Sequence, residues 1–105
     1  MNVSERYRQL VQEARHLLES RQAANEAGEG RELRLVVQAV QGLAELGERV
    51  GDVPRIRLEA ELTPVLLKAH MQLDRARLIL EEAGDAAAGA VWEMEQKIYR
   101  LLNEL

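Results

Sequence analysis

The sequence contains no cysteine and no phenylalanine, and only two of its 105 residues are proline. The absence of cysteine excludes disulfides, a thiolate nucleophile and Cys-ligated zinc, and it fits a cytoplasmic location. The longest uncharged apolar stretch, Ala86 to Trp92, is far below the roughly 18 residues that a membrane-spanning helix needs. The first residues also lack the basic region and apolar core of a signal peptide. We therefore expect one cytoplasmic domain, residues 1–105, with no cofactor and no membrane anchor.

The sequence also has few aromatic residues and no net positive charge. The net charge is −4, with acidic and basic residues finely mixed, and this balance argues against nucleic acid as the main partner. Leucine, alanine, glutamate and arginine dominate the remainder, and these residues favour helix over strand. The composition therefore predicts an all-α protein.

Apolar residues recur at helical spacing in four stretches, 2–20, 31–50, 53–83 and 85–105. Asn2 with Glu5 forms a capping box at the first stretch, and glycines at 28, 30, 51 and 84 separate the stretches. Pro64 interrupts the third stretch, because proline removes a backbone hydrogen bond and clashes with the preceding turn. We predict an all-α, four-helix antiparallel bundle whose third helix is kinked or broken near Pro64, and whose first helix frays from about Arg21.

The second and fourth stretches carry more apolar residues than one buried stripe requires. The surplus residues are Leu35, Ala39, Leu46, Trp92, Tyr99 and Leu102. Aromatic residues are typical anchors of protein interfaces. The sequence therefore predicts that these six residues contact another protein, with a homodimer favoured over a different partner.

Residues capable of chemistry are few. Glu13 and His16 have the Glu-x-x-His spacing of helical metal sites, but the motif occurs once and lies to one side of the apolar stripe. His70 and Asp74 are one helical turn apart, as in general-base pairs, yet no nucleophile or phosphate-binding loop accompanies them. We expect no catalytic and no metal-binding residues, and hence no enzyme.

Five arginines cluster around the second stretch and the turn that follows it: Arg31, Arg34, Arg49, Arg55 and Arg57. Six acidic residues lie among them between positions 29 and 59, so the segment is not basic. Because nucleic-acid binding needs a positive surface, direct binding by this segment is not expected.

Residues 33–67, and above all Pro54 to Leu62, resemble the helical collar region of bacterial DNA polymerase III tau/gamma subunits, in which a Pro-Arg-apolar-x-Leu-Glu segment follows an amphipathic helix. The resemblance covers about a third of the chain, lacks the ATPase domains and departs from the pattern at Thr63-Pro64. It implies a role in assembling subunits. Three hypotheses follow: a self-associating interaction module, an accessory factor of a replication-type complex, and a small helical enzyme or ligand carrier.

Overall fold

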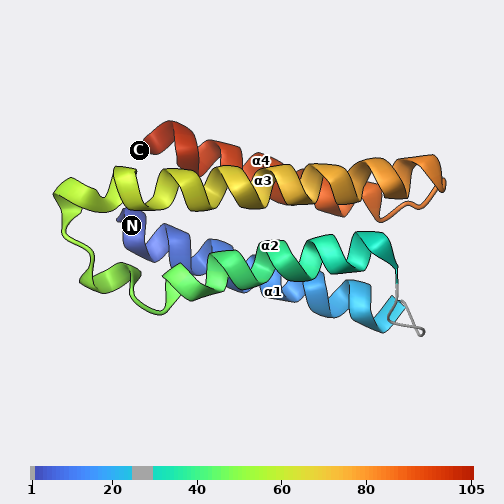
Figure 1. Cartoon of the computed structure of the whole chain (residues 1–105), viewed down its shortest axis with the longest axis horizontal. Helices are drawn as coiled ribbons and strands as arrows, with labels where there is room; N and C mark the ends of the chain where they lie inside the picture. The colour runs from blue at the N-terminus through green and yellow to red at the C-terminus, as the bar shows by residue number, and fades with distance from the viewer. Residues whose placement is uncertain (1, 25–29) are drawn as a thin grey trace.

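The protein is a bundle of four antiparallel α-helices, seen in a computed structural model that describes residues 2–24 and 30–105 (Figure 1). The helices are α1 (Val3–Ala24), α2 (Arg31–Gly47), α3 (Leu58–Glu82) and α4 (Ala88–Glu104), with two short 3-10 turns, η1 (Val50–Asp52) and η2 (Arg55–Arg57), between α2 and α3. The described residues contain no β-strand. The predicted all-α, antiparallel four-helix bundle is confirmed.

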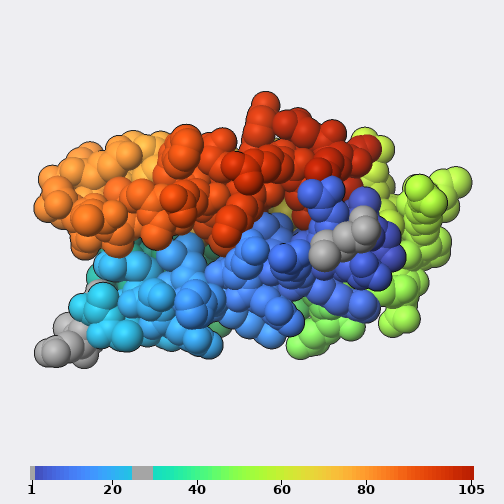
Figure 2. Space-filling model, turned by 180° about the vertical axis from the view of Figure 1, so that it is seen from behind, coloured from blue at the N-terminus to red at the C-terminus, as the bar shows by residue number. Residues whose placement is uncertain are grey.

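Each helix packs against two others, so the four helices enclose a common core. α1 contacts α2 and α4, and α3 contacts the same two helices; Figure 2 shows α4 lying along α1 on the far side of the molecule. Tyr7 is fully buried in this core, where its hydroxyl donates a hydrogen bond of 2.6 Å to the backbone carbonyl oxygen of Leu43. That bond satisfies the one polar atom of the ring and ties α1 to α2.

The predicted break near Pro64 is wrong, because α3 is helical throughout Leu58–Glu82 with Pro64 inside it. The missing proline N–H would have bonded the carbonyl of Ala60, four residues earlier. Pro64 and Ala60 both lie on the exposed side of the helix, so water can bond that carbonyl. Thr63 is therefore not a helix cap.

The chain breaks instead directly after α2. The second helix was expected to reach Val50, but it ends at Gly47, and residues 48 and 49 form a turn before η1. A Cβ atom on Gly47 would lie 3.3 Å from the Cγ2 atom of Val11, so glycine allows α1 to approach α2 closely here. Val50, which follows the turn, is fully buried and closes this end of the core.

The remaining helix ends largely follow the sequence. The Asn2 side chain accepts a 2.8 Å hydrogen bond from the backbone N–H of Glu5, as the capping box predicts. Gly84 ends the α3 turn with φ of 68°, a conformation that favours glycine. Asp85 accepts a hydrogen bond from the N–H of Ala87 before α4. The turn expected at Gly28 lies outside the described residues.

The C-terminal end of α1 differs from the expected fraying. α1 continues to Ala24, and Arg21 lies against α2 and the turn before α4. Its Nη2 atom is 3.3 Å from Glu32 Oε1 and 3.6 Å from Asp85 Oδ2. These ion pairs connect three parts of the chain and hold the last turns of α1 in place.

Gly42 provides a test of the α2 packing. It lies inside α2, and a Cβ atom added to it would meet nothing within 4 Å. Gly42→Ala should therefore raise the free energy of unfolding by about 0.5–1 kcal/mol, the difference in helix propensity between the two residues. Urea unfolding followed by circular dichroism measures it. Gly84→Ala is the opposing control and should lower stability, because its φ is positive; a loss of stability in Gly42→Ala would contradict the described packing.

None of the helices described in residues 2–24 and 30–105 combines the length and the apolar composition needed to cross a membrane.

Candidate interaction surface

Large apolar side chains are exposed mainly on one pair of helices. Six such residues are strongly exposed in the described part of the chain, and five of them lie on α3 and α4. The five are Leu67, Met71 and Leu78 on α3 and Trp92 and Tyr99 on α4. We call these five residues the α3–α4 outer face; the sixth, Ile56, lies in η2.

The helical register places these five residues on the outer side of the α3–α4 pair. Leu67, Met71 and Leu78 lie roughly opposite the buried core residues around α3, at about 100° per residue. The row of side chains beside them on α3 contacts α4, as the ion pair between Arg77 and Glu95 shows. Trp92 and Tyr99 lie three and four residues from Glu95, on the α3 side of α4. In Figure 1, α3 and α4 form the upper half of the bundle, above α1 and α2.

The face is organised in layers along the helices. α3 and α4 run antiparallel from the turn at residues 83–87, so Leu78 and Trp92 lie equally far from that turn. Met71 and Tyr99, each seven residues further along its helix, form a second apolar layer. The polar layer between them contains Asp74 and Glu95. The face therefore has two apolar layers separated by charged groups.

The charged layer is a compact cluster centred on Glu95. The Glu95 side chain is 3% exposed, although it is charged in its ordinary state. Arg77 Nε donates a 3.2 Å hydrogen bond to Glu95 Oε2, Arg77 Nη2 donates one of 2.6 Å to Asp74 Oδ1, and Arg77 Nη1 donates one of 2.7 Å to Glu81 Oε1. His70 Nε2 lies 3.9 Å from Glu95 Oε1. We call His70, Asp74, Arg77, Glu81 and Glu95 the Glu95 cluster.

The two inner carboxyl groups have opposite pKa shifts. The pKa of Glu95 is raised to about 7, first by burial and then by the neighbouring Asp74 carboxyl, while Arg77 opposes the rise. The pKa of Asp74 is lowered, first by its hydrogen bond with Arg77 and then by that with Glu95. The Glu95 carboxyl therefore keeps its proton to a higher pH than an ordinary glutamate does, beside an Asp74 whose pKa is lowered.

Glu95 was not predicted from the sequence, although a signal was present. It lies four residues after Val91 and three before Ile98, both fully buried, so it falls inside the apolar stripe of α4. A carboxyl group within such a stripe is a candidate buried acid. Its partner Arg77 also pairs with Glu81, one helical turn further along α3, at 2.7 Å.

Two of the six predicted interface residues lie in the core of this chain. Ala39 and Leu46 are buried, because α2 packs between α1 and α3 and uses both of its apolar stripes. Their assignment to a surplus face is therefore corrected. Leu35 and Leu102 are half-buried and pack against the core cluster. Trp92 and Tyr99 are 51% and 54% exposed and remain available to a partner.

The acidic residue of each candidate chemical motif, Glu13 in one and Asp74 in the other, forms an ion pair. Glu13 Oε2 is 3.2 Å from Lys97 Nζ on α4, and within the described residues no three acidic or histidine side chains are placed to hold a metal ion. His70 and Asp74 both belong to the Glu95 cluster, in which Asp74 is bonded to Arg77.

The five arginines between residues 31 and 57 differ in their contacts. Arg49 and Arg57 share Glu61, at 3.8 Å and 3.0 Å from its carboxylate. Arg31, Arg34 and Arg55 are exposed.

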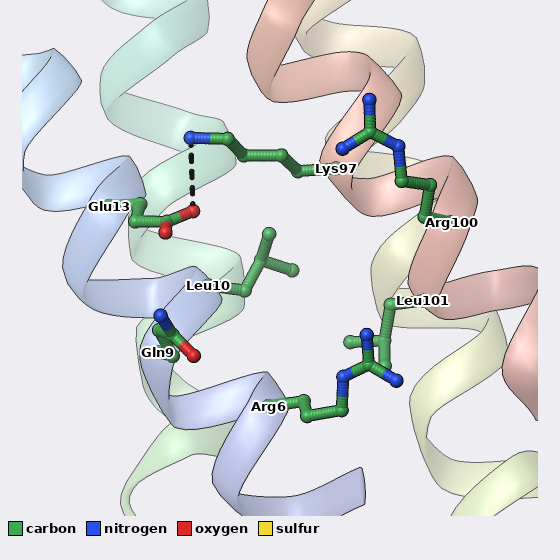
Figure 3. Close-up of a pocket in the computed structure, with 7 residues that line it drawn as sticks. All are labelled: Arg6, Gln9, Leu10, Glu13, Lys97, Arg100 and Leu101. Carbon is green, nitrogen blue, oxygen red and sulfur yellow. Dashed lines mark ion pairs between the residues drawn. The ribbon is translucent and has the colours of Figure 1, made fainter. Parts of the chain in front are cut away.

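A cleft of about 210 Å³ lies between α1 and α4 (Figure 3). It is lined by Arg6, Gln9, Leu10, Glu13, Lys97, Arg100 and Leu101. The ion pairs of Lys97 with Glu13 and of Arg6 with Glu104 connect α1 to α4 at its rim. The cleft is open to solvent, and the charges along it serve to join the two helices.

Comparison with protein-family models, with curated proteins and with solved structures gives no match to this chain.

Proposed function

We propose that this protein is a non-catalytic interaction module that associates with a second copy of itself through the α3–α4 outer face. The exposure of Trp92 and Tyr99 on one face supports the proposal most directly, because tryptophan and tyrosine are enriched among residues that dominate binding energy. Three leucine and methionine side chains of α3 extend the same face. An exposed apolar patch rimmed by polar residues is typical of a binding surface.

The size of this face suits a stable dimer. The molecule extends 43 Å along its long axis and 20–22 Å across, so one side of the bundle presents on the order of 850 Å². A standard protein interface buries about 800 Å² on each partner. The side of the bundle formed by α3 and α4 is therefore similar in size to a standard interface.

The layers of the face favour one arrangement of two copies. Consider a two-fold axis that lies in the interface, perpendicular to α3 and α4, at the level of Asp74 and Gln96. This axis would place each helix against the same helix of the other copy, in antiparallel orientation. The Leu78–Trp92 layer of each copy would then lie on the Met71–Tyr99 layer of the other. Such an interface is self-complementary, as two-fold symmetry requires.

The absence of cysteine allows a direct test of the geometry. We expect Gln96→Cys, placed on the axis between Trp92 and Tyr99, to form an intermolecular disulfide under mild oxidation. A disulfide requires Cα atoms within about 7 Å of each other, a condition that only residues near the axis satisfy. Gel electrophoresis without reductant measures the yield.

Asn103→Cys is the matched control. Asn103 is exposed on the same helix but lies seven residues beyond Gln96, so its two copies would be separated by roughly 20 Å at 1.5 Å per residue. It should remain unlinked. Cross-linking of Asn103→Cys with none at Gln96→Cys would refute the antiparallel pairing. The accessory-factor role and the enzyme or carrier role remain predictions from the sequence.

A further inference from the structure

The Glu95 cluster lies between the two apolar layers of the α3–α4 outer face. This inference rests on the proposed self-association, because it concerns what a second copy does to that cluster. A covering partner cannot reach Trp92 and Tyr99 without also covering the charged layer between them. The charges of that layer must therefore be accommodated in the interface.

The cluster has more negative than positive charge. With Glu95 ionised, three carboxylates, of Asp74, Glu81 and Glu95, share the single guanidinium of Arg77. Glu81 is 50% exposed and Asp74 is 40% exposed, so water now screens part of this charge. Glu95 itself has almost no contact with water.

A second copy would remove that screening. Under the antiparallel arrangement, the axis passes through the level of Asp74 and Glu95, so the two clusters would face each other. Each carboxylate would then meet like charges from the other copy in a region of low dielectric, where charge repulsion increases. Neutral Glu95 reduces the repulsion and donates a hydrogen bond to Asp74. Ionised Glu95 increases it.

We propose that Glu95 binds a proton when a second copy covers the α3–α4 outer face, so that lowering the pH strengthens self-association. The proton comes from water and is held between the Glu95 and Asp74 carboxyl groups. At most one proton is taken up per subunit. The cluster is thus a proton-dependent element of the interface.

The other charged groups near Glu95 define the controls. On α3 these are His70, Asp74 and Arg77. α1 packs on the opposite side of α4, where its charged residues Arg6 and Glu13 pair with other residues of α4. His70 is therefore the other group whose proton binding needs a separate test.

The experiment measures the dimer dissociation constant by analytical ultracentrifugation at pH 6, 7 and 8. For the unchanged chain, the dissociation constant should rise by at least about tenfold from pH 6 to pH 8, the effect of linked proton uptake. Glu95→Gln keeps the hydrogen-bonding shape of the neutral acid. It should dimerise equally at all three values and at pH 8 more tightly than the unchanged chain.

His70→Gln separates the two proton-binding groups. It should keep the pH dependence of the unchanged chain. Loss of the pH dependence in His70→Gln, or its retention in Glu95→Gln, would overturn the role of Glu95 while leaving the dimer intact. A chain that is monomeric at all three pH values would instead refute the self-association itself, and this proposal with it.

Discussion

Changing Trp92 and Tyr99 together to serine should weaken self-association by at least about 100-fold. Each aromatic ring at the centre of an interface commonly contributes about 2 kcal/mol or more, and each 1.4 kcal/mol corresponds to a tenfold change in affinity. Both rings occur twice in a symmetric dimer. Because both are about half exposed in the single chain, the helical fold should survive. Ultracentrifugation measures the dissociation constant, and circular dichroism checks the fold.

Ile56→Ser is the matched control for that double variant. Ile56 is the most exposed large apolar residue among those that the structure describes, at 91%, but it lies in η2 and outside the α3–α4 outer face. Its loss should leave the dimer unchanged. An equal weakening by Ile56→Ser, or an unchanged dimer in the Trp92 and Tyr99 variant, would show that the contact lies elsewhere.

Arg77→Met should lower the free energy of unfolding by about 3 kcal/mol at pH 8, as expected when a buried charge loses its partner. Arg77 is the cation bonded to both Asp74 and Glu95. Without it, two carboxylates remain beside each other with no opposite charge. Arg77→Met should be introduced into the variant in which Trp92 and Tyr99 are serine, and unfolding by urea should be measured there. Because that variant is expected to self-associate weakly, association then contributes little to the measured stability.

The pH dependence of this loss follows from the raised pKa of Glu95. Between about pH 4.5 and 7, the folded state binds more protons than the unfolded state, so the free energy of unfolding falls as the pH rises. Asp74 acts oppositely: its pKa is lowered, so its contribution is present above its ordinary value and is lost in more acidic solution. Arg77→Met should therefore cost less at pH 5, where Glu95 is neutral, than at pH 8.

Glu95→Gln should rescue Arg77→Met, because glutamine replaces the buried charge with a neutral group. The double variant is expected to be more stable at pH 8 than Arg77→Met alone and to vary little between pH 5 and 8. A double variant as unstable as Arg77→Met at pH 8 would mean that the arginine stabilises the fold by packing and not by charge.

The sequence was sufficient to predict the helices, because their apolar spacing is regular and their caps are local. The hydrogen bond at Asn2 and the positive φ of Gly84 depend on neighbours within four residues. Pro64 was misread because the cost of a helical proline depends on whether the freed carbonyl meets water. That carbonyl, of Ala60, lies on the exposed side, a fact that depends on tertiary packing.

The interaction surface was only partly predictable for the same reason. Surplus apolar stripes on α2 and α4 look alike in sequence, but α2 lies between α1 and α3 and buries Ala39 and Leu46. Only the α4 stripe retains exposed aromatic residues. Leu67, Met71 and Leu78 were not predicted as surface residues of this face, because their role depends on which helix packs beside α3.

The mass of the unchanged chain in solution tests the central claim most directly. Sedimentation equilibrium at pH 6 and tens of micromolar protein should give twice the 11.9 kDa of one chain, with dissociation on dilution. A mass of 11.9 kDa at every concentration would contradict the account, because the α3–α4 outer face would then remain uncovered.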